Sequence, residues 1–365
     1  MGSHDFICCQ KALMSGGPQN FLARLQRELS AHSLPPYHII NPHPHQLNKL
    51  ADPGHLKIGR LDGPSYYLAT SENLANLIRQ RKKIPAPLLT AVSALPAAAT
   101  RWLTGPLNAY LNRSSRAILE NADGLIFQSL LSKEMHRLFV ASRQRVVPER
   151  IIYNGVPVDI FSPTEQAQPN ISEYPRLVIT ASFRLHKRLW DAIALTNLLA
   201  KTYPRIKLYV AGGMDILTQN ALCDLDVSRV EFLGHVKSED LPKLYAGCDI
   251  GLSPSLFDPC PNSVIEMMAS GLPVITTQAS GAAELIGHDD LMVAEAVSLE
   301  HMALQTAGKI PRIDLEKWQE RVFYCLEHQQ ELGGFILERA RTHFDIRIVA
   351  KHYAEFIQEV YDAKN

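Results

Sequence analysis

The 365-residue sequence predicts an α/β protein built from two doubly wound domains. Short apolar segments typical of strands alternate with amphipathic segments typical of helices, a pattern that indicates parallel sheets joined by crossover helices. The alternation comes in two series, separated by a polar, proline-containing stretch at 161–173. A chain of this length can also bury two separate cores. We therefore expect domains over 1–165 and 166–343.

The first series supplies five expected strands and at least two helices. The strands are 5–11, 38–40, 56–59, 124–127 and 150–153, and the helices run over 19–30 and from a cap near Ser132. Gly16 and Gly17 form the turn into the first helix, where Pro18 suits a first helical position.

The second series repeats this pattern and then becomes helical. We expect strands at 176–181, 207–211, 230–233 and 249–253, another strand after Pro273, and helices over 189–202, from 238–240, and over 262–270. Gly271 is expected to end the last of these helices, and the chain from about 313 onward reads as helices.

Composition excludes several kinds of protein. Lys plus Arg and Asp plus Glu both number 37, so no overall basic field favours nucleic acid, and any anion site must be built locally. None of the six cysteines forms a CxxC pair, which favours reduced thiols in a cytoplasmic protein. No metal site is expected.

The segment 84–102 is apolar but broken by prolines, so it is either a loop with short helices or a peripheral membrane contact.

The run from Ser253 to Glu284 carries the most chemistry. It reads as strand, loop, helix, strand and loop, with Asp258 in the first loop. Asn262 or Ser263 is expected to cap the helix. Its first N–H groups, including that of Val264, and the positive end of its dipole then suit a phosphate. Glu266, about one turn into the helix, can accept two hydrogen bonds from a vicinal diol such as a ribose.

A second cluster, Ala181 to Arg188, directly follows an expected strand. Arg184 and Lys187 are cations three residues apart, and such a pair can hold a diphosphate, Arg through its planar fork and Lys as a point charge. The alternative is a solvated basic turn. We expect His186 and Arg188 to be exposed.

The run of two acidic residues with seven between them, followed by a small-residue helix end and Gly-x-Pro-Val, closely resembles the signature of the family 4 glycosyltransferases. The resemblance implies the GT-B fold and retaining transfer of a sugar from a nucleotide diphosphate. It also implies that Asp258 contacts the donor sugar, that Glu266 holds the ribose, and that Arg184 and Lys187 clamp the diphosphate. Family members usually carry Glu where this chain has Asp258. The resemblance covers about 153–287 well and the first domain loosely.

Other residues carry weaker implications. Gly234 and His235 either line the base pocket through backbone atoms or simply end a strand. Gly16 and Gly17 either approach the donor or form a plain turn. Asp62 is either an acceptor-side proton acceptor or an internal partner of Arg60. The histidine that many relatives carry in this domain has no match here.

The expected partners are a nucleotide sugar and an unknown saccharide or lipid-linked acceptor, with no metal and no other cofactor. The leaving phosphate can itself accept the proton of the acceptor. Two alternatives remain, a catalytically silent nucleotide-sugar-binding subunit and a nucleotide-sugar epimerase of the same fold. The resembled fold also implies that the C-terminal helix, about 344–365, packs back on the first domain, and its apolar spacing fits a docked helix.

Overall fold

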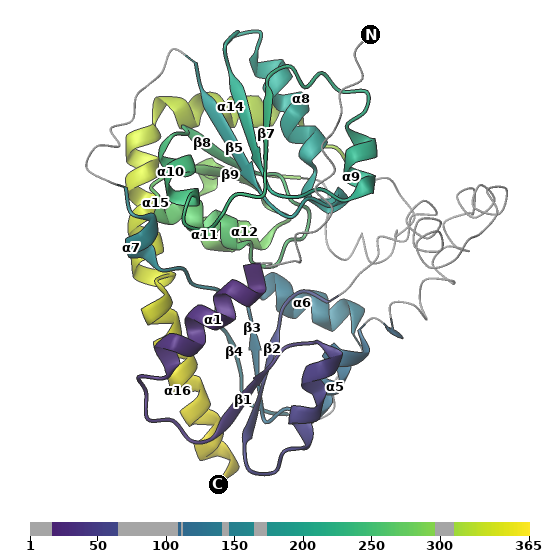
Figure 1. Ribbon diagram of the computed structural model, residues 1–365, viewed down its shortest axis with the longest axis vertical. Coiled ribbons are helices and arrows are strands. Elements are labelled where there is room, and N and C mark those ends of the chain that lie inside the picture. Colours follow the sequence, from purple (N-terminus) through teal and green to yellow (C-terminus); the bar gives the residue numbers. More distant parts are fainter. Residues whose placement is uncertain (1–16, 65–108, 111, 141–145, 164–173, 296–309) are drawn as a thin grey trace, which may run out of the picture.

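The computed structural model contains two parallel β-sheets, each flanked by helices (Figure 1). It describes residues 17–64, 109–110, 112–140, 146–163, 174–295 and 310–365. The expected strand 5–11, Gly16, the segment 84–102 and the boundary between residues 165 and 166 lie outside this part of the chain.

The first domain holds a sheet of order β1-β2-β3-β4, all parallel. Its strands are β1 (Tyr37–Ile40), β2 (Leu56–Leu61), β3 (Gly124–Phe127) and β4 (Glu149–Ile151). Its described helices are α1 (Gly17–Leu29), the 3₁₀ helix η1 (Pro44–Ala51), α5 (Arg113–Asn121) and α6 (Leu130–Phe139).

The C-terminal helix α16 (Ile346–Lys364) lies against this first domain, beside α1 (Figure 1). Phe21, Leu25 and Leu29 of α1 pack in one buried cluster with Tyr353, Phe356 and other apolar residues of α16. The helix also crosses close to β3, because a Cβ on Gly124 would lie 2.4 Å from Val360 Cγ2. The last helix of the chain therefore completes the first core.

The second domain holds a parallel sheet of order β10-β9-β8-β5-β6-β7. Its strands are β5 (Arg176–Thr180), β6 (Lys207–Ala211), β7 (Val230–Gly234), β8 (Ile250–Ser253), β9 (Val274–Thr277) and β10 (Met292–Val293). Its described helices, with the linking helix α7, are α7 (Val158–Phe161), η2 (Leu185–Lys187), α8 (Leu189–Leu199), α9 (Ile216–Ala221), α10 (Leu241–Ala246), α11 (Asn262–Ala269), α12 (Gly281–Ile286), η3 (Asp289–Leu291), α14 (Leu315–Glu327) and α15 (Gln329–His343).

The order of this sheet fixes where a ligand can bind. From β5 the chain adds β6 and β7 on one side and then β8, β9 and β10 on the other. The connections beyond β5 and β8 therefore leave in opposite directions. Such a switch point opens a crevice at the carboxyl ends of the two strands, which is where open α/β sheets bind ligands.

Helix starts differ from the sequence expectation in three places. Ser129, not Ser132, caps α6, and its hydroxyl accepts the Ser132 N–H at 2.9 Å. Asp240 precedes α10 without making a side-chain capping bond. Pro261 occupies the cap position of α11, so Asn262 and Ser263 are already helical and do not cap it. The cap position lies where the backbone changes from extended to helical geometry, and only a side chain at that position can reach the free N–H groups.

No helix in the described part of the chain is both long enough and apolar enough to cross a bilayer. The described cysteines are free thiols, and three of them, Cys248, Cys260 and Cys325, are buried, whereas Cys223 is exposed. Burial raises the pKa of Cys248 and of Cys260 to about 12.

Candidate functional site

The loop after β5 and the loop after β8 lie side by side at the switch point. The carbonyl of His186 accepts the Leu256 N–H at 2.8 Å, which ties the two loops together. Arg184 precedes the short helix η2 and is exposed, whereas Lys187 ends that helix. Arg184 can therefore reach a ligand in the crevice without first leaving a buried site.

Lys187 forms an ion pair with Asp258, across these two loops. Their side chains are only 16% and 12% exposed, so water screens the pair weakly. The structure thus brings together two of the residues that the sequence assigned to the donor. Each of the two charges therefore already has a partner in the other.

The Asp258 loop is held by the start of α12. The Asp258 carbonyl accepts the Gly281 N–H at 2.8 Å and the Ser280 hydroxyl at 3.2 Å. A Cβ on Gly281 would lie 1.8 Å from the Pro259 carbonyl oxygen, so only glycine fits there. Phe257 adopts a left-handed φ of 51° beside this contact. The position of Asp258 is therefore set by backbone packing.

His186 and Arg188 are not the exposed residues that the sequence predicted. Arg188 is 0% exposed and forms a bidentate pair with Glu295, with N–O distances of 2.6 and 2.9 Å. Its backbone has a left-handed φ of 51° at the start of α8. Burial, together with neighbouring Lys187, lowers the pKa of His186 to about 3, so this ring is neutral at pH 7.

The first turn of α11 is already partly occupied. Asn262 Oδ1 accepts Asn154 Nδ2–H at 2.7 Å, so Asn262 joins the two domains. Ser263 is half-buried. The Val264 N–H bonds the Pro261 carbonyl at 3.0 Å, and the Val264 side chain is fully buried. The Val264 N–H therefore already has an acceptor within the chain, and a phosphate contact at this group stays a prediction.

Glu266 is buried at the domain interface. Burial raises its pKa to about 7, although Arg24 of α1 opposes the shift from 3.8 Å away. A carboxyl group with this environment changes its charge near neutral pH. Arg24 belongs to the other domain, and its contact with Glu266 was not foreseen from the sequence.

Gly234 and His235 lie at the end of β7, an edge strand of the second sheet. Both residues are exposed, and Gly234 has a left-handed φ of 62°. The Gly234 carbonyl accepts the Gly212 N–H at 2.6 Å, which joins the ends of β7 and β6. The backbone here is thus open to solvent two strands away from Lys187.

Asp62 is paired internally, the alternative that the sequence left open. Its carboxylate forms an ion pair with Arg60, whose side chain is fully buried. Arg60 also donates to Asn154 Oδ1 at 2.7 Å and to Asn41 Oδ1 and Gln128 Oε1 at 3.3 Å. The Asp62 carboxylate thus has a partner within the first domain, and its role as a proton acceptor stays untested. Gly17 is the first residue of α1, and its approach to the donor stays a prediction.

Sequence reasoning missed the contacts of Glu284. This residue of α12 accepts the N–H groups of Leu130 and Leu131, at 2.7 and 2.8 Å, and the Tyr153 hydroxyl at 3.1 Å. A carboxylate of the second domain therefore caps helix α6 of the first. The only signal in the sequence was that Glu284 ends the chemistry-bearing run.

Residues 175–307 match the family described as Glycosyl transferases group 1. The second domain is a group 1 glycosyl transferase domain. The match includes Arg184, Lys187, Asp258 and Glu266, so this glycosyl transferase domain contains the whole second-domain part of the predicted donor site.

Full-length comparisons extend the likeness to the first domain. The sucrose-phosphate synthase structure from Thermosynechococcus elongatus superposes with a TM-score of 0.63 at 18% identity, covering 95% of this chain and 94% of that one. The Anabaena HepE structure in complex with UDP gives 0.58 at 15%, covering 93% and 82%. These likenesses show that the chain has the GT-B fold.

The sequence is also similar to glycogen synthase from Mycobacterium tuberculosis, with 24% identity over 205 residues. The alignment covers 55% of this chain and 48% of that protein. The chain therefore spans about half the length of this curated relative.

Proposed function

We propose that this protein transfers a sugar, with retention of configuration, from a nucleotide diphosphate carrier to a hydroxyl group of an acceptor. The observation that carries the proposal is the meeting of Lys187 and Asp258 at the carboxyl ends of β5 and β8. A cation for a diphosphate and an anion for sugar hydroxyls stand there at the switch point where such sheets bind nucleotides.

Donor binding exchanges partners within this pair. The diphosphate replaces Asp258 as the partner of Lys187, and exposed Arg184 adds a second cation to it. Asp258 is then free to accept hydrogen bonds from hydroxyls of the sugar. Because negative charge on the diphosphate grows as the glycosidic bond breaks, the two cations stabilise the transition state more than the ground state.

The nucleoside lies between β7 and α11 in this proposal. Glu266 accepts hydrogen bonds from the ribose, and the exposed backbone at Gly234 and His235 faces the base. The HepE structures hold UDP or UDP-glucose, so uridine nucleotides are the first donors to test.

The chemical step needs no separate base. The bond between the anomeric carbon and the phosphate oxygen breaks, the acceptor oxygen bonds that carbon on the same face, and the acceptor proton passes to the leaving diphosphate. Asp62, paired with Arg60, contributes to the fold instead of taking this proton. We further propose that no metal takes part in the transfer, because Arg184 and Lys187 supply the positive charge.

The acceptor is proposed to be a saccharide or a lipid-linked saccharide used in polysaccharide or glycoconjugate synthesis at the cytoplasmic side. A peripheral membrane contact through 84–102 belongs to the same proposal.

A two-stage experiment tests the function. Thermal-shift screening over nucleotide diphosphates and their sugars identifies the donor, since a ligand at 100 times its dissociation constant stabilises a fold by about 2.7 kcal/mol. Products are then analysed by mass spectrometry with and without acceptor sugars. New glycosides or donor hydrolysis support a transferase. Tight nucleotide binding with no turnover, or an epimerised donor without acceptor, would overturn the proposal.

A further inference from the structure

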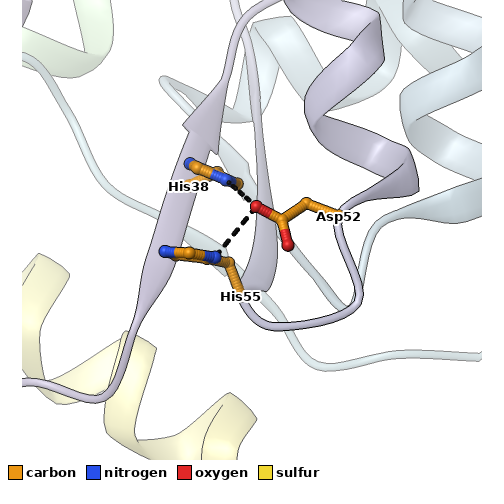
Figure 2. A group of neighbouring side chains, drawn as sticks. All are labelled: His38, Asp52 and His55. Carbon is orange, nitrogen blue, oxygen red and sulfur yellow. Dashed lines mark hydrogen bonds and ion pairs between the residues drawn. The ribbon is translucent and has the colours of Figure 1, made fainter.

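Three potential metal ligands meet at the amino ends of β1 and β2, away from the carboxyl-end crevice. His38 is the second residue of β1, and Asp52 and His55 lie in the connection between η1 and β2. One ligand atom from each residue lies within 4.8 Å of the others. Figure 2 shows the two rings side by side, each with a nitrogen facing the same oxygen of Asp52.

The contacts differ in kind. His38 Nε2 makes a hydrogen bond with Asp52 Oδ2 at 2.9 Å. His55 Nδ1 lies equally close, at 2.9 Å, and is shielded from solvent, yet among the described residues it makes no hydrogen bond of acceptable geometry. A hydrogen bond weakens steeply as its proton leaves the line between donor and acceptor. A metal ion binds off that line, at the apex of a triangle, and so can satisfy both nitrogens and the oxygen.

The carboxylate is already oriented for such an ion. Asp52 Oδ1 accepts the Gly54 N–H at 2.9 Å, which leaves Oδ2 directed at the rings. Hydrogen bonds of this kind behind a ligating carboxylate fix its direction and strengthen metal binding.

We propose that His38, Asp52 and His55 bind one divalent transition-metal ion, with Zn²⁺ as the best match, and that solvent completes its coordination. Two imidazoles and one carboxylate form a donor set that zinc uses, with ligand distances of about 2.0–2.2 Å. Tetrahedral coordination separates neighbouring ligand atoms by about 3.3 Å, so each nitrogen–oxygen pair, now 2.9 Å apart, needs to open by only a few tenths of an ångström.

Binding also requires one ring to turn. The His38 and His55 rings are stacked, with centroids 4.3 Å apart and planes 17° apart, whereas a bound metal lies in the plane of each ring. The side chains are 23% and 39% exposed, so at least one can rotate about its second side-chain torsion, which is a soft one. Loss of the ring stacking is therefore part of the proposal.

The ion would stabilise a weakly anchored connection. No residue of η1 is fully buried, so apolar packing holds this segment loosely between β1 and β2. A metal joining His38 of the strand to Asp52 and His55 of the connection would close this loop and favour the folded state. The site lies at the amino end of the first sheet, whereas Lys187 lies at the carboxyl end of the second, so the site does not depend on the proposed transfer.

The test is a zinc titration of the full chain after removal of metals with a chelator. Calorimetry should show one Zn²⁺ per chain, and thermal unfolding should shift upward with zinc. Asp52→Asn and His55→Gln each alter a ligand itself. Each should therefore weaken zinc binding by at least about tenfold, the lower end of the loss found when a partner behind a ligand is removed. NMR of the histidine ring protons should show His38 and His55 losing their stacked environment as zinc is added.

His45→Gln is the matched control, because His43 and His45 form a nearby stacked pair with centroids 5.5 Å apart. It should leave zinc affinity unchanged. Circular dichroism confirms that each variant folds. Equal zinc affinity in the wild type and in Asp52→Asn would overturn the site, as would an equal loss in His45→Gln. Absence of binding at tens of micromolar zinc would also overturn it.

Discussion

The two sides of the crevice handle charge in opposite ways. In the second domain, Lys187 and Asp258 meet as a single pair at loop ends, and neither has a further side-chain partner among the described residues. In the first domain, Arg60 is fully buried and bonds four side chains, those of Asn41, Asp62, Gln128 and Asn154. A ligand can replace one partner of the Lys187–Asp258 pair at the loss of a single contact. The Arg60 cluster, by contrast, forms part of the core of the first domain. We therefore assign the chemistry to the second domain and a structural role to the Arg60 cluster of the first domain.

Lys187→Ala breaks this comparison most strongly. Removing one electrostatic donor to a developing negative charge lowers kcat by roughly 100- to 1,000-fold. Melting temperature should fall less than in Asp62→Asn, because the Asp258 side chain is 12% exposed and can be hydrated in part, whereas the Arg60 side chain is fully buried. Steady-state kinetics and thermal unfolding measured on the same preparations check both parts. Lys187→Arg should restore only part of the rate, since a planar fork does not replace a compact ammonium group.

Asp62→Asn should show the reverse pattern. It removes the charged partner of a buried guanidinium, and a hydrogen bond to a charged group contributes about 2 kcal/mol. We expect a lower free energy of unfolding and kcat within a few-fold of wild type. Denaturant unfolding and kinetics decide this. A large loss of kcat with unchanged stability would restore Asp62 as a catalytic residue.

The sequence predicted local structure better than contacts between distant segments. The strands 124–127 and 207–211 match β3 and β6 residue for residue, because each is an apolar run between turn signals, with Lys207 as the one charged residue. Arg184, Lys187 and Asp258 could be assigned to the crevice because each follows directly after a strand.

Contacts that cross the chain left no such signal. Arg188 looked like a surface charge because its partner Glu295 lies 107 residues away. Arg24 and Glu284 act across the domain interface, and their partners are 100 or more residues distant in sequence. No periodicity or spacing in a single sequence records which remote side chain or helix end a charged group will meet.

Glu284→Gln tests the contact between the two sides. The carboxylate caps α6 from the other domain, and losing a helix cap costs about 1 kcal/mol. We expect a modest rise in KM, a slightly lower melting temperature and a larger radius of gyration by X-ray scattering. Glu316→Gln, in the exposed first turn of α14, is the control and should change none of these. An unchanged scattering profile in Glu284→Gln would mean that the cap does not hold the domains together.

Glu266→Gln should have a pH-dependent effect on stability. Burial raises the pKa of Glu266 to about 7 in the folded protein, above its usual value near 4.5. Between these pH values the folded state holds a proton that the unfolded state has released, so stability falls as pH rises through this window. Melting temperatures should therefore be similar for wild type and variant at pH 4.5, and higher for the variant at pH 8. The same variant should raise KM for the donor with little change in kcat. Identical differences at both pH values would contradict this environment for Glu266.

The exchange of partners at Lys187 is tested most directly by the affinity of Asp258→Asn for the free nucleotide diphosphate that the screen identifies. Asp258 pairs with Lys187 and, in the proposed exchange, competes with an incoming diphosphate for it. Isothermal titration calorimetry should therefore show binding by Asp258→Asn that is as tight as wild type or tighter, while sugar transfer falls sharply. A collapse of nucleotide affinity in this variant would contradict the account, because Asp258 would then belong to the nucleotide site or to the fold and not to the sugar.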